Sequence, residues 1–354
     1  MKKLNEKQDF NNRTEMKLIS YLKDSKFRAA LLINDVIVDI EDGSGSTGKK
    51  LPSSMKELLE VWGDATGILE MIIKNFHAGN VAGLSSNEVV IGPPVPNPTS
   101  CRDGYAFRQH VATARRNRGV PMIPEFDQYP VFYFTNHNAI YGGGDLIVES
   151  DHLQKLDFEL EAAIVIGRHG RNIKSYEADN YIAGYMIMND FSARVLQMEE
   201  MLLNLGPAKG KDFATAIGPW LVTPDELEGR KISTPYGDKY DLSMKARHNG
   251  SLISEGNLNQ MDWTFAELIE RASYGVDLYP GDIIGSGTVG TGCYLELNGT
   301  AALQAKEKGE EFTPVWLKEG DEIELEIEGF GRLSNTIRRS VDDYSILAKK
   351  KLIL

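Results

Sequence analysis

Residues 156–167 read LDFELEAAIVIG, in which three acidic residues alternate with apolar ones before an unbroken apolar run begins. The run predicts a β-strand in the protein core. Because the side chains of a strand alternate between its two faces, Asp157, Glu159 and Glu161 share one face. A buried carboxylate without a partner is costly, so these acids need a cation or several hydrogen-bond donors. A solvated edge strand with an acidic face is the alternative interpretation of this segment alone.

The next apolar segment, residues 181–190 (YIAGYMIMND), also ends in a carboxylate, Asp190, and the sequence FSARVLQ follows it. Helical spacing from that point places Asp190, Arg194 and Gln197 on one stripe. Asp190 is then either the N-cap of this helix or a third carboxylate ligand beside a guanidinium and an amide.

A fourth acid, Asp103, begins the segment DGYAFRQHV at residues 103–111. Four carboxylates without a cluster of cysteine or histidine beside them form an oxygen-rich set of ligands. Such a set favours a hard cation, Mg²⁺ or Ca²⁺, over structural zinc.

The sequence also indicates how the chain is divided. Four prolines in residues 91–100 (IGPPVPNPTS) predict a linker, because proline removes backbone donors and stiffens the chain. We therefore divide the chain into a small N-terminal domain, residues 1–98, and a larger domain, residues 99–354. In the larger domain short strands outnumber helices and do not alternate regularly with them, which predicts a β-rich α+β fold. The expected helical stretches are residues 104–117, 190–204 and 262–272.

Composition narrows the classes of function and the compartment. The formal net charge of −12 argues against a nucleic-acid partner, because an acidic chain repels phosphate backbones. No run of apolar residues is long enough to predict a membrane span, and residues 1–14 lack the apolar segment of a secretory signal. With only two cysteines, Cys101 and Cys293, the chain suits a reducing compartment, and we expect a cytoplasmic protein.

Two glycine motifs match nucleotide-binding loops loosely, and we reject both. Residues 43–49 spell G-x-x-x-x-G-K, but Lys50 stands where a Ser or Thr must hold magnesium, so we expect a flexible loop there. Residues 285–290 spell G-x-G-x-x-G, but the following CYLELNG (residues 293–299) predicts a strand where a dinucleotide loop needs a helix. We therefore expect no nucleotide cofactor.

Taken in order, seven segments resemble the fumarylacetoacetate hydrolase family over about residues 100–340. The segments are DGYAFRQH, DFELEAAIVIGRHGRNI, AGYMIMNDFSARVLQ, LGPAKGKDFATAIGPWLV, LYPGDIIGSGT, YLELNGT and GDEIELEIEGFGRL. The resemblance implies a mixed β-roll catalytic domain of the fumarylacetoacetase type, with a small β-rich N-terminal domain, in a homodimer. It also implies a metal-dependent hydrolase that cleaves a carbon–carbon bond in a small-molecule β-diketo acid. Fumarylacetoacetate and related acylpyruvates are the expected substrates, and aromatic amino acid catabolism is the implied setting.

The resemblance assigns roles by position. The metal ligands would be Asp103, Glu159, Glu161 and Asp190, with Lys211 and Thr215 also at the metal site, and Mn²⁺ joins Mg²⁺ and Ca²⁺ as a candidate ion. The general base would be His110, oriented by Glu296. The residues that stabilise developing negative charge would be Arg194, Gln197 and Lys211. The substrate contacts would be Tyr105, Arg194, Gln197 and Thr288.

The sequence departs from the family pattern in two places. Residues 198–204 (MEEMLLN) replace an aromatic stretch that carries a substrate-binding tyrosine, and one residue is added there. The family's second substrate-binding arginine has no clean match. Arg115, Arg116 and Arg118 lie near its position, and they form either a solvated helix face or a site for an anionic substrate.

The assigned residues suit hydrolysis between two carbonyl groups. His110 would deprotonate a water molecule, because the ordinary pKa of histidine lies near working pH, and Glu296 would fix its tautomer. Arg194, Gln197 and Lys211 would donate to the oxyanion, where the loss of one donor commonly costs about 2.7–4 kcal/mol.

Several alternatives stay open at this point. Alone, His110 is also typical of a packed core histidine, Glu296 of a solvent-facing strand residue, and Lys211 of a loop. The scaffold also hosts metal-dependent lyases, decarboxylases and isomerases, since a fold does not fix a function. A non-catalytic protein that binds a diketo acid is the third hypothesis.

Overall fold

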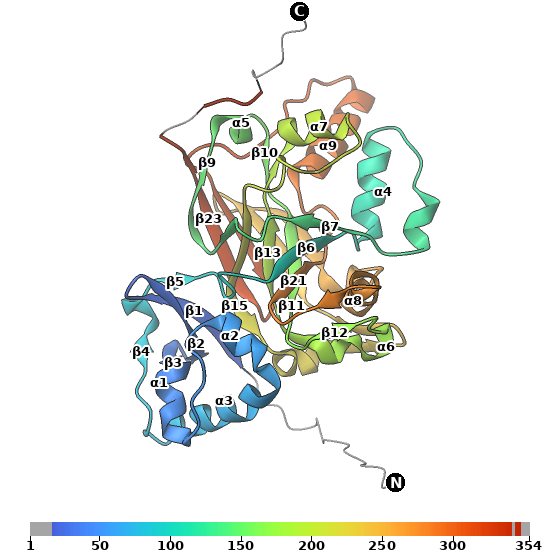
Figure 1. Cartoon of the computed structure of the whole chain (residues 1–354). Coiled ribbons are helices and arrows are strands. Elements are labelled where there is room, and N and C mark those ends of the chain that lie inside the picture. Colours follow the sequence, from blue (N-terminus) through green and yellow to red (C-terminus); the bar gives the residue numbers. More distant parts are fainter. Residues whose placement is uncertain (1–15, 342–343, 348–354) are drawn as a thin grey trace, which may run out of the picture.

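The computed structural model describes residues 16–341 and 344–347, which form two large β-sheets and three short strand pairs, with helices around the sheets (Figure 1). This strand-rich mixture of elements confirms the predicted α+β class. The polar segment at residues 1–14 lies outside the described residues. Among the helices that are described, none has both the length and the apolar character needed to cross a bilayer.

The larger sheet has 12 strands and runs through both predicted domains. Its strand order is β4 (Leu84–Ser85), β3 (Val36–Asp39), β2 (Lys26–Ile33), β1 (Lys17–Lys23), β15 (Thr215–Val222), β13 (Ile182–Asp190), β11 (Leu160–Ile166), β21 (Asp282–Gly285), β6 (Ser100–Gly104) and β7 (Phe132–Thr135). Two short strands, β5 (Ile91–Gly92) and β8 (Ile140–Tyr141), pair with β1 and β15.

The smaller sheet has five strands, and helices lie around both sheets (Figure 1). The strand order is β19 (Ser251–Asn257), β18 (Ser243–His248), β22 (Glu322–Ile327), β23 (Gly331–Arg339) and β9 (Gly144–Val148). The helices are α1 (Ile40–Ser44), α2 (Met55–Glu60), α3 (Trp62–His77), α4 (Arg108–Asn117), α5 (Ser150–Leu153), α6 (Ser175–Ala178), α7 (Arg194–Met201), α8 (Phe265–Ser273) and α9 (Tyr294–Lys308). The remaining strands form short pairs, β10 (Leu156–Asp157) with β14 (Ser192–Ala193), β12 (Gly170–Arg171) with β20 (Asp277–Leu278), and β16 (Lys231–Thr234) with β17 (Gly237–Tyr240).

Strand β11 is buried on both faces, as its apolar run predicts. Ile164 packs into a central core that the larger sheet shares with the smaller sheet and with α8. The next residue, Val165, points to the opposite face and packs into an N-terminal core together with α2 and α3. Each apolar residue of this strand therefore contributes to one of two cores, so Glu161, near its start, is buried along with them.

The N-terminal segment joins the larger sheet directly. Strand β1 pairs with β15, with Leu18 opposite Leu221, and both side chains belong to the N-terminal core. Strands β2 and β3 pair through a turn at Asn34 and Asp35, whose φ angles of 48° and 65° suit a tight hairpin turn. The boundary near residue 98 stays a prediction, and the sheet continues across it.

Three local predictions were wrong. Residues 294–299, expected to be a strand, begin helix α9. Asp190 ends strand β13, and α7 begins only at Arg194, so these two residues do not share a helical stripe. Residues 43–47, expected to be a loop, are helical and pack against α3.

Candidate active site

Three of the four predicted acidic ligands lie on the same face of the larger sheet. Asp103 is near the end of β6, Glu161 near the start of β11, and Asp190 at the end of β13. Each lies two residues from a side chain of the N-terminal core on its own strand, and side chains two apart share a face. These core residues are Cys101, Ala163 and Met188. The register of the strands therefore brings together acids that are far apart in sequence.

We call Asp103, Glu159, Glu161 and Asp190 the carboxylate cluster, and all four side chains are buried. Carboxylate oxygens of Asp103, Glu159 and Glu161 lie within 4.8 Å of one another. Glu161 accepts from the Thr288 hydroxyl at 3.2 Å, and its second oxygen has no hydrogen-bond partner. One buried oxygen of Asp190 also has none.

Lys211 is the counter-charge of this cluster. Its ammonium donates to Asp190 at 2.6 Å and also to Glu159, and its side chain is buried. Tyr133, on β7, donates to the same Asp190 carboxylate. Burial lowers the pKa of Lys211, but the Asp190 and Glu159 carboxylates outweigh that effect and hold it above its usual value. Lys211 is therefore charged, and it partly neutralises the acids around it.

The acids differ in how strongly they hold a proton. Burial and then the charge of Asp190 raise the pKa of Asp103 to about 7. Burial and the charge of Asp103 raise the pKa of Glu161 well above its usual value. Burial also acts to raise the pKa of Glu159, but Lys211 and Arg194 lower it to about 2. One end of the cluster is thus neutralised by protein cations, while the other is crowded with negative charge.

A divalent cation fits this donor set. The available ligands are carboxylate oxygens, two of which lack a hydrogen-bond partner, and a positive charge would relieve the repulsion between Asp103 and Glu161. Thr215 is buried and lies opposite Asp190 in the pairing of β15 with β13. It therefore borders the cluster from the neighbouring strand.

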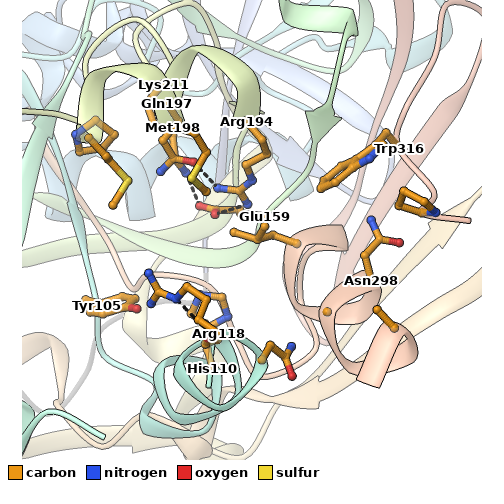
Figure 2. Close-up of a pocket in the computed structure, with 18 of the residues that line it drawn as sticks. Tyr105, His110, Arg118, Glu159, Arg194, Gln197, Met198, Lys211, Asn298 and Trp316 are labelled. Carbon is orange, nitrogen blue, oxygen red and sulfur yellow. Dashed lines mark hydrogen bonds and ion pairs between the residues drawn. The ribbon is translucent and has the colours of Figure 1, made fainter. Parts of the chain in front are cut away.

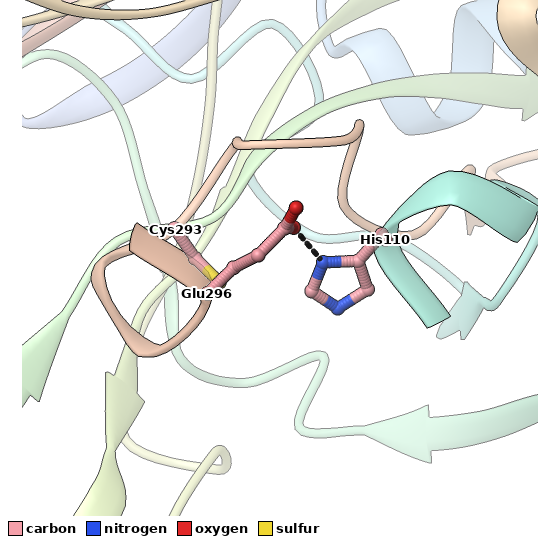
Figure 3. Close-up of side chains that lie close together, drawn as sticks. All are labelled: His110, Cys293 and Glu296. Carbon is pink, nitrogen blue, oxygen red and sulfur yellow. Dashed lines mark hydrogen bonds and ion pairs between the residues drawn. The ribbon is translucent and has the colours of Figure 1, made fainter. Parts of the chain in front are cut away.

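His110 and Glu296 meet from two helices. The Nδ1 atom of His110, on α4, lies 2.7 Å from a carboxylate oxygen of Glu296, on α9, and both side chains are buried. Asn117 also links the two helices, because its amide donates a hydrogen bond to the backbone carbonyl of Glu296 at 3.0 Å. Figure 3 shows the imidazole facing the Glu296 carboxylate, with Cys293 beside the base of that side chain.

Arg194 connects the cluster to the predicted substrate residues. Its guanidinium donates to Glu159 at 2.8 Å and to the side-chain oxygen of Gln197 at 2.9 Å. It also donates to Asp157, a buried acid outside the predicted ligand set. Figure 2 shows Glu159, Arg194, Gln197 and Lys211 gathered on one side of a cavity.

That cavity has a volume of about 640 Å³ and opens between α4, α7 and α9. His110, Tyr105 and Arg118 lie across from the Arg194 group (Figure 2). The Tyr105 ring packs edge-on against His110, with 5.9 Å between ring centroids. The other lining residues are Ala114, Asn117, Tyr133, Met198, Met201, Pro207, Leu295, Asn298, Gly299, Ala302, Phe312, Pro314 and Trp316.

The structure therefore brings most of the predicted site residues into one region. Thr288 lies behind Glu161 and is not among the residues that line the cavity, although a substrate contact was predicted for it. The sequence reasoning missed Tyr133 and Asp157, and it left Arg118 undecided. Nothing in the sequence around Tyr133 indicated its contact with Asp190.

The first glycine of the motif at residues 285–290 leaves room for an acid of the carboxylate cluster. A Cβ atom on Gly285 would lie 2.5 Å from an Asp103 carboxylate oxygen and 2.8 Å from the sulfur of Met188. A helix does follow this motif, contrary to our prediction. Its first backbone N–H groups, on Tyr294 and Leu295, are taken by Asp157, so this helix end is not free to hold a phosphate.

Comparison with known proteins identifies related sequences over most of the chain. Residues 99–338 match the family model for the fumarylacetoacetate (FAA) hydrolase C-terminal region. The mitochondrial oxaloacetate tautomerase FAHD2B of Bos taurus is 33% identical over 294 residues, which cover 81% of this chain and 80% of that protein. The mitochondrial oxaloacetate tautomerase FAHD2A of Homo sapiens is 30% identical over 328 residues, covering 88% and 90%.

Solved structures share the fold. Fumarylacetoacetate hydrolase from Exiguobacterium antarcticum superposes with a TM-score of 0.64 at 24% identity, covering 92% of this chain and 100% of that one. Maleylpyruvate hydrolase from Sphingobium sp. SYK-6, in complex with manganese(II) ion and pyruvate, has a TM-score of 0.64 at 21% identity, with the same coverage.

We predict that Gly285→Ala weakens metal binding by about tenfold, a typical effect of disturbing the surroundings of a ligand. The added methyl group must displace Asp103 or Met188. Isothermal titration with Mn²⁺ measures the change. Gly63→Ala is the matched control, because a Cβ at that helical position meets no atom within 4 Å. Equal affinity in wild type and Gly285→Ala would contradict the placement of Asp103 in the site.

A second prediction concerns pH. In metal-free protein the pKa of Asp103 is raised from 3.8 to about 7, so its contribution to stability is present below pH 3.8 and is lost as pH rises through 7. A bound cation favours the ionised form and restores that stability. We expect the rise in Tm on adding Mg²⁺ or Mn²⁺ to be larger at pH 8 than at pH 6.

The measurement is thermal unfolding with EDTA and with metal at both pH values. Asp103→Asn is the control, because it removes the titrating group and should shrink the difference between the two pH values. An identical gain at pH 6 and pH 8 in wild type would show that Asp103 does not exchange a proton for the cation.

Proposed function

The chain belongs to the fumarylacetoacetate hydrolase family, and we propose that it is a metal-dependent enzyme that interconverts the keto and enol forms of a short 2-oxo dicarboxylic acid such as oxaloacetate. Two observations support this reaction. His110, which pairs with the buried Glu296, lines the same cavity as Glu159 of the carboxylate cluster and the cations Arg194 and Lys211. Relatives at 30–33% identity, covering over four fifths of this chain, carry the name oxaloacetate tautomerase.

The His110–Glu296 pair carries this proposal. Glu296 accepts the Nδ1–H of His110, which leaves Nε2 unprotonated as a base. Nε2 takes a proton from the carbon next to the 2-oxo group, and the electron pair moves onto the carbonyl oxygen as an enolate. Glu296 stabilises the imidazolium that forms, as the acid does in a serine-protease triad. Return of the proton to oxygen gives the enol, and the reverse sequence gives the keto form.

The other residues bind and orient the diacid. A divalent cation, held by Asp103, Glu159, Glu161 and Asp190, would supply Lewis-acid polarisation of the substrate's carbonyl oxygen. Arg194 and Gln197 stand beside Glu159 at the cavity wall, where they can donate to a substrate carboxylate or carbonyl group. Arg118 lies across the cavity from them (Figure 2) and forms no ion pair within the described residues, so its charge is available to a second carboxylate.

A second candidate is hydrolysis of a carbon–carbon bond in a larger β-diketo acid. The cavity of about 640 Å³ exceeds what a four-carbon diacid fills, and Met198, Leu295 and Trp316 give it an apolar wall. In that reaction Nε2 of His110 would take its proton from water, which attacks the carbonyl carbon. The enolate of the departing fragment would then take up the proton.

Several expectations stay proposals. The bound ion is Mg²⁺, Ca²⁺ or Mn²⁺, and a neighbour solved with manganese(II) ion and pyruvate supports including Mn²⁺ in the assays. The homodimer, the small-molecule diketo acid partner and a role in aromatic amino acid catabolism rest on the family resemblance alone. The names of the similar tautomerases include "mitochondrial", so the cytoplasmic location stays a prediction.

Purified protein loaded with Mg²⁺ or Mn²⁺ tests both reactions. The decay of the ultraviolet absorbance of enol-oxaloacetate measures tautomerisation. The loss of diketone absorbance in acylpyruvates and fumarylacetoacetate, with ¹⁸O from labelled water appearing in one product acid, measures hydrolysis. No acceleration of either reaction with any of the three ions would refute the proposed function.

We predict that His110→Ala lowers kcat by about a hundredfold or more, because positioned acid–base groups commonly contribute 10²–10⁴-fold. The variant should keep its metal affinity, since His110 is not a member of the carboxylate cluster. His77→Ala, at an exposed histidine on α3, is the matched control and should retain the wild-type rate. Full activity in His110→Ala would exclude His110 as the base.

Arg118→Gln should raise KM for oxaloacetate about tenfold or more, because an ionic contact to a carboxylate contributes about 1.5–3 kcal/mol. It should change kcat little. Arg116→Gln is the control, since Arg116 lies in the last turn of α4, two residues before Arg118, but does not line the cavity. Steady-state kinetics with oxaloacetate and with a monocarboxylic 2-oxo acid checks this prediction. A KM increase of the same size for both acids would mean that Arg118 does not bind the second carboxylate.

A further inference from the structure

We propose that Asp157 is the positioning residue that fixes the two halves of the active site relative to each other. One half is the helix end that carries Glu296, and the other is the guanidinium of Arg194. The inference rests on the proposed function for its kinetic readout, while its geometric part can be tested without turnover.

Asp157 is fully buried, yet it is surrounded by donors. Its two carboxylate oxygens accept from the Nε and Nη2 atoms of Arg194 at 2.9 and 2.7 Å. They also accept from the backbone N–H groups of Tyr294 and Leu295 at 2.7 and 2.9 Å, and from that of Phe158 at 2.9 Å. Burial raises the pKa of Asp157 and Arg194 opposes the rise. A carboxylate placed between five donors has little freedom to move.

The backbone contacts fix the start of α9. The residue before this helix, Cys293, makes no side-chain capping bond. The N–H groups of the first turn therefore depend on Asp157, on strand β10, for hydrogen-bond acceptors. The N-terminus of a helix favours a negative charge, and its first N–H groups have no partner within the helix. Glu296 is the third residue of α9 and follows directly after the two bonded residues. A shift of this turn would therefore move Glu296 relative to His110.

The side-chain contacts fix Arg194. Two of its three nitrogens donate to a single Asp157 oxygen, which sets the plane of the guanidinium. In that plane its Nη2 also meets Glu159 and its Nη1 meets Gln197, so both cavity-lining partners depend on the same orientation. Asp157 lines no part of the cavity, and it acts on the substrate only through these residues.

Asp157→Asn tests the proposal, because it keeps the shape of the side chain and removes its charge. We expect kcat to fall about tenfold or more, as is common when the partner of a catalytic group is lost. The effect should be strongly non-additive with Glu296→Gln and with Arg194→Lys in double-mutant cycles, because those residues would already be misplaced. A merely structural role would give additive effects.

The control is Thr264→Val, which removes the side-chain cap of α8, a helix with no residue among those that line the cavity. It should lower Tm while leaving kcat and KM unchanged. If Asp157→Asn yields no folded protein, Asp157→Ser is measured in the same way, since a serine hydroxyl still accepts from a helix N-terminus.

An activity-independent measurement separates this inference from the proposed function. In protein with ¹⁵N-labelled histidine, the Nδ1 signal of His110, assigned with His110→Ala, reports its hydrogen bond to Glu296. We expect Asp157→Asn to move this signal towards its position in Glu296→Gln. An unchanged signal, or additive effects in both double-mutant cycles, would overturn the positioning role. An inactive wild type with a shifted signal would refute the proposed function alone.

Discussion

The repulsion among four buried carboxylates is the constraint on which the rest of this structure depends. Removing several acids from water at the centre of a sheet is unfavourable unless cations and donors surround them. Lys211 and Arg194 balance one end of the cluster through Glu159 and Asp190, but Asp103 and Glu161 are left facing each other. The fold therefore keeps together carboxylates that no protein cation neutralises, and a hard dication can take the place of their protons.

The sheet makes this arrangement possible. Strand β11 is buried on both faces, so its register cannot slip by one residue without exchanging its two sets of core side chains. The same alternation that packs Ala163 and Val165 into the N-terminal core aims Glu161 at the cluster. Hydrophobic packing thus sets where the acids point, and the small size of Gly285 leaves room for one of them.

Sequence reasoning reached the chemistry of this site more reliably than its geometry. Acidic residues beside an apolar run, as in residues 157–166, indicate either buried carboxylates or a solvated edge strand, and in the structure these acids are buried. The first turn of α9 was mistaken for a strand, because Leu295 and Leu297 flank Glu296 in a pattern that is short enough to suit either structure. Tyr133, Arg118 and the role of Asp157 depend on contacts between distant segments, which no local pattern records.

The pairing of β1 with β15 has a consequence for how this protein is built. Strand β15 also pairs with β13, which ends in Asp190, so β1 lies only two strands from the strand that carries this acid. Removal of the residues before about position 98 would expose the side chains of Ile217 and Leu221 to water, because they pack in the N-terminal core. Residues 16–98 are thus part of the packing that supports the strands carrying the acids, and they do not form an appendage that can be exchanged between enzymes.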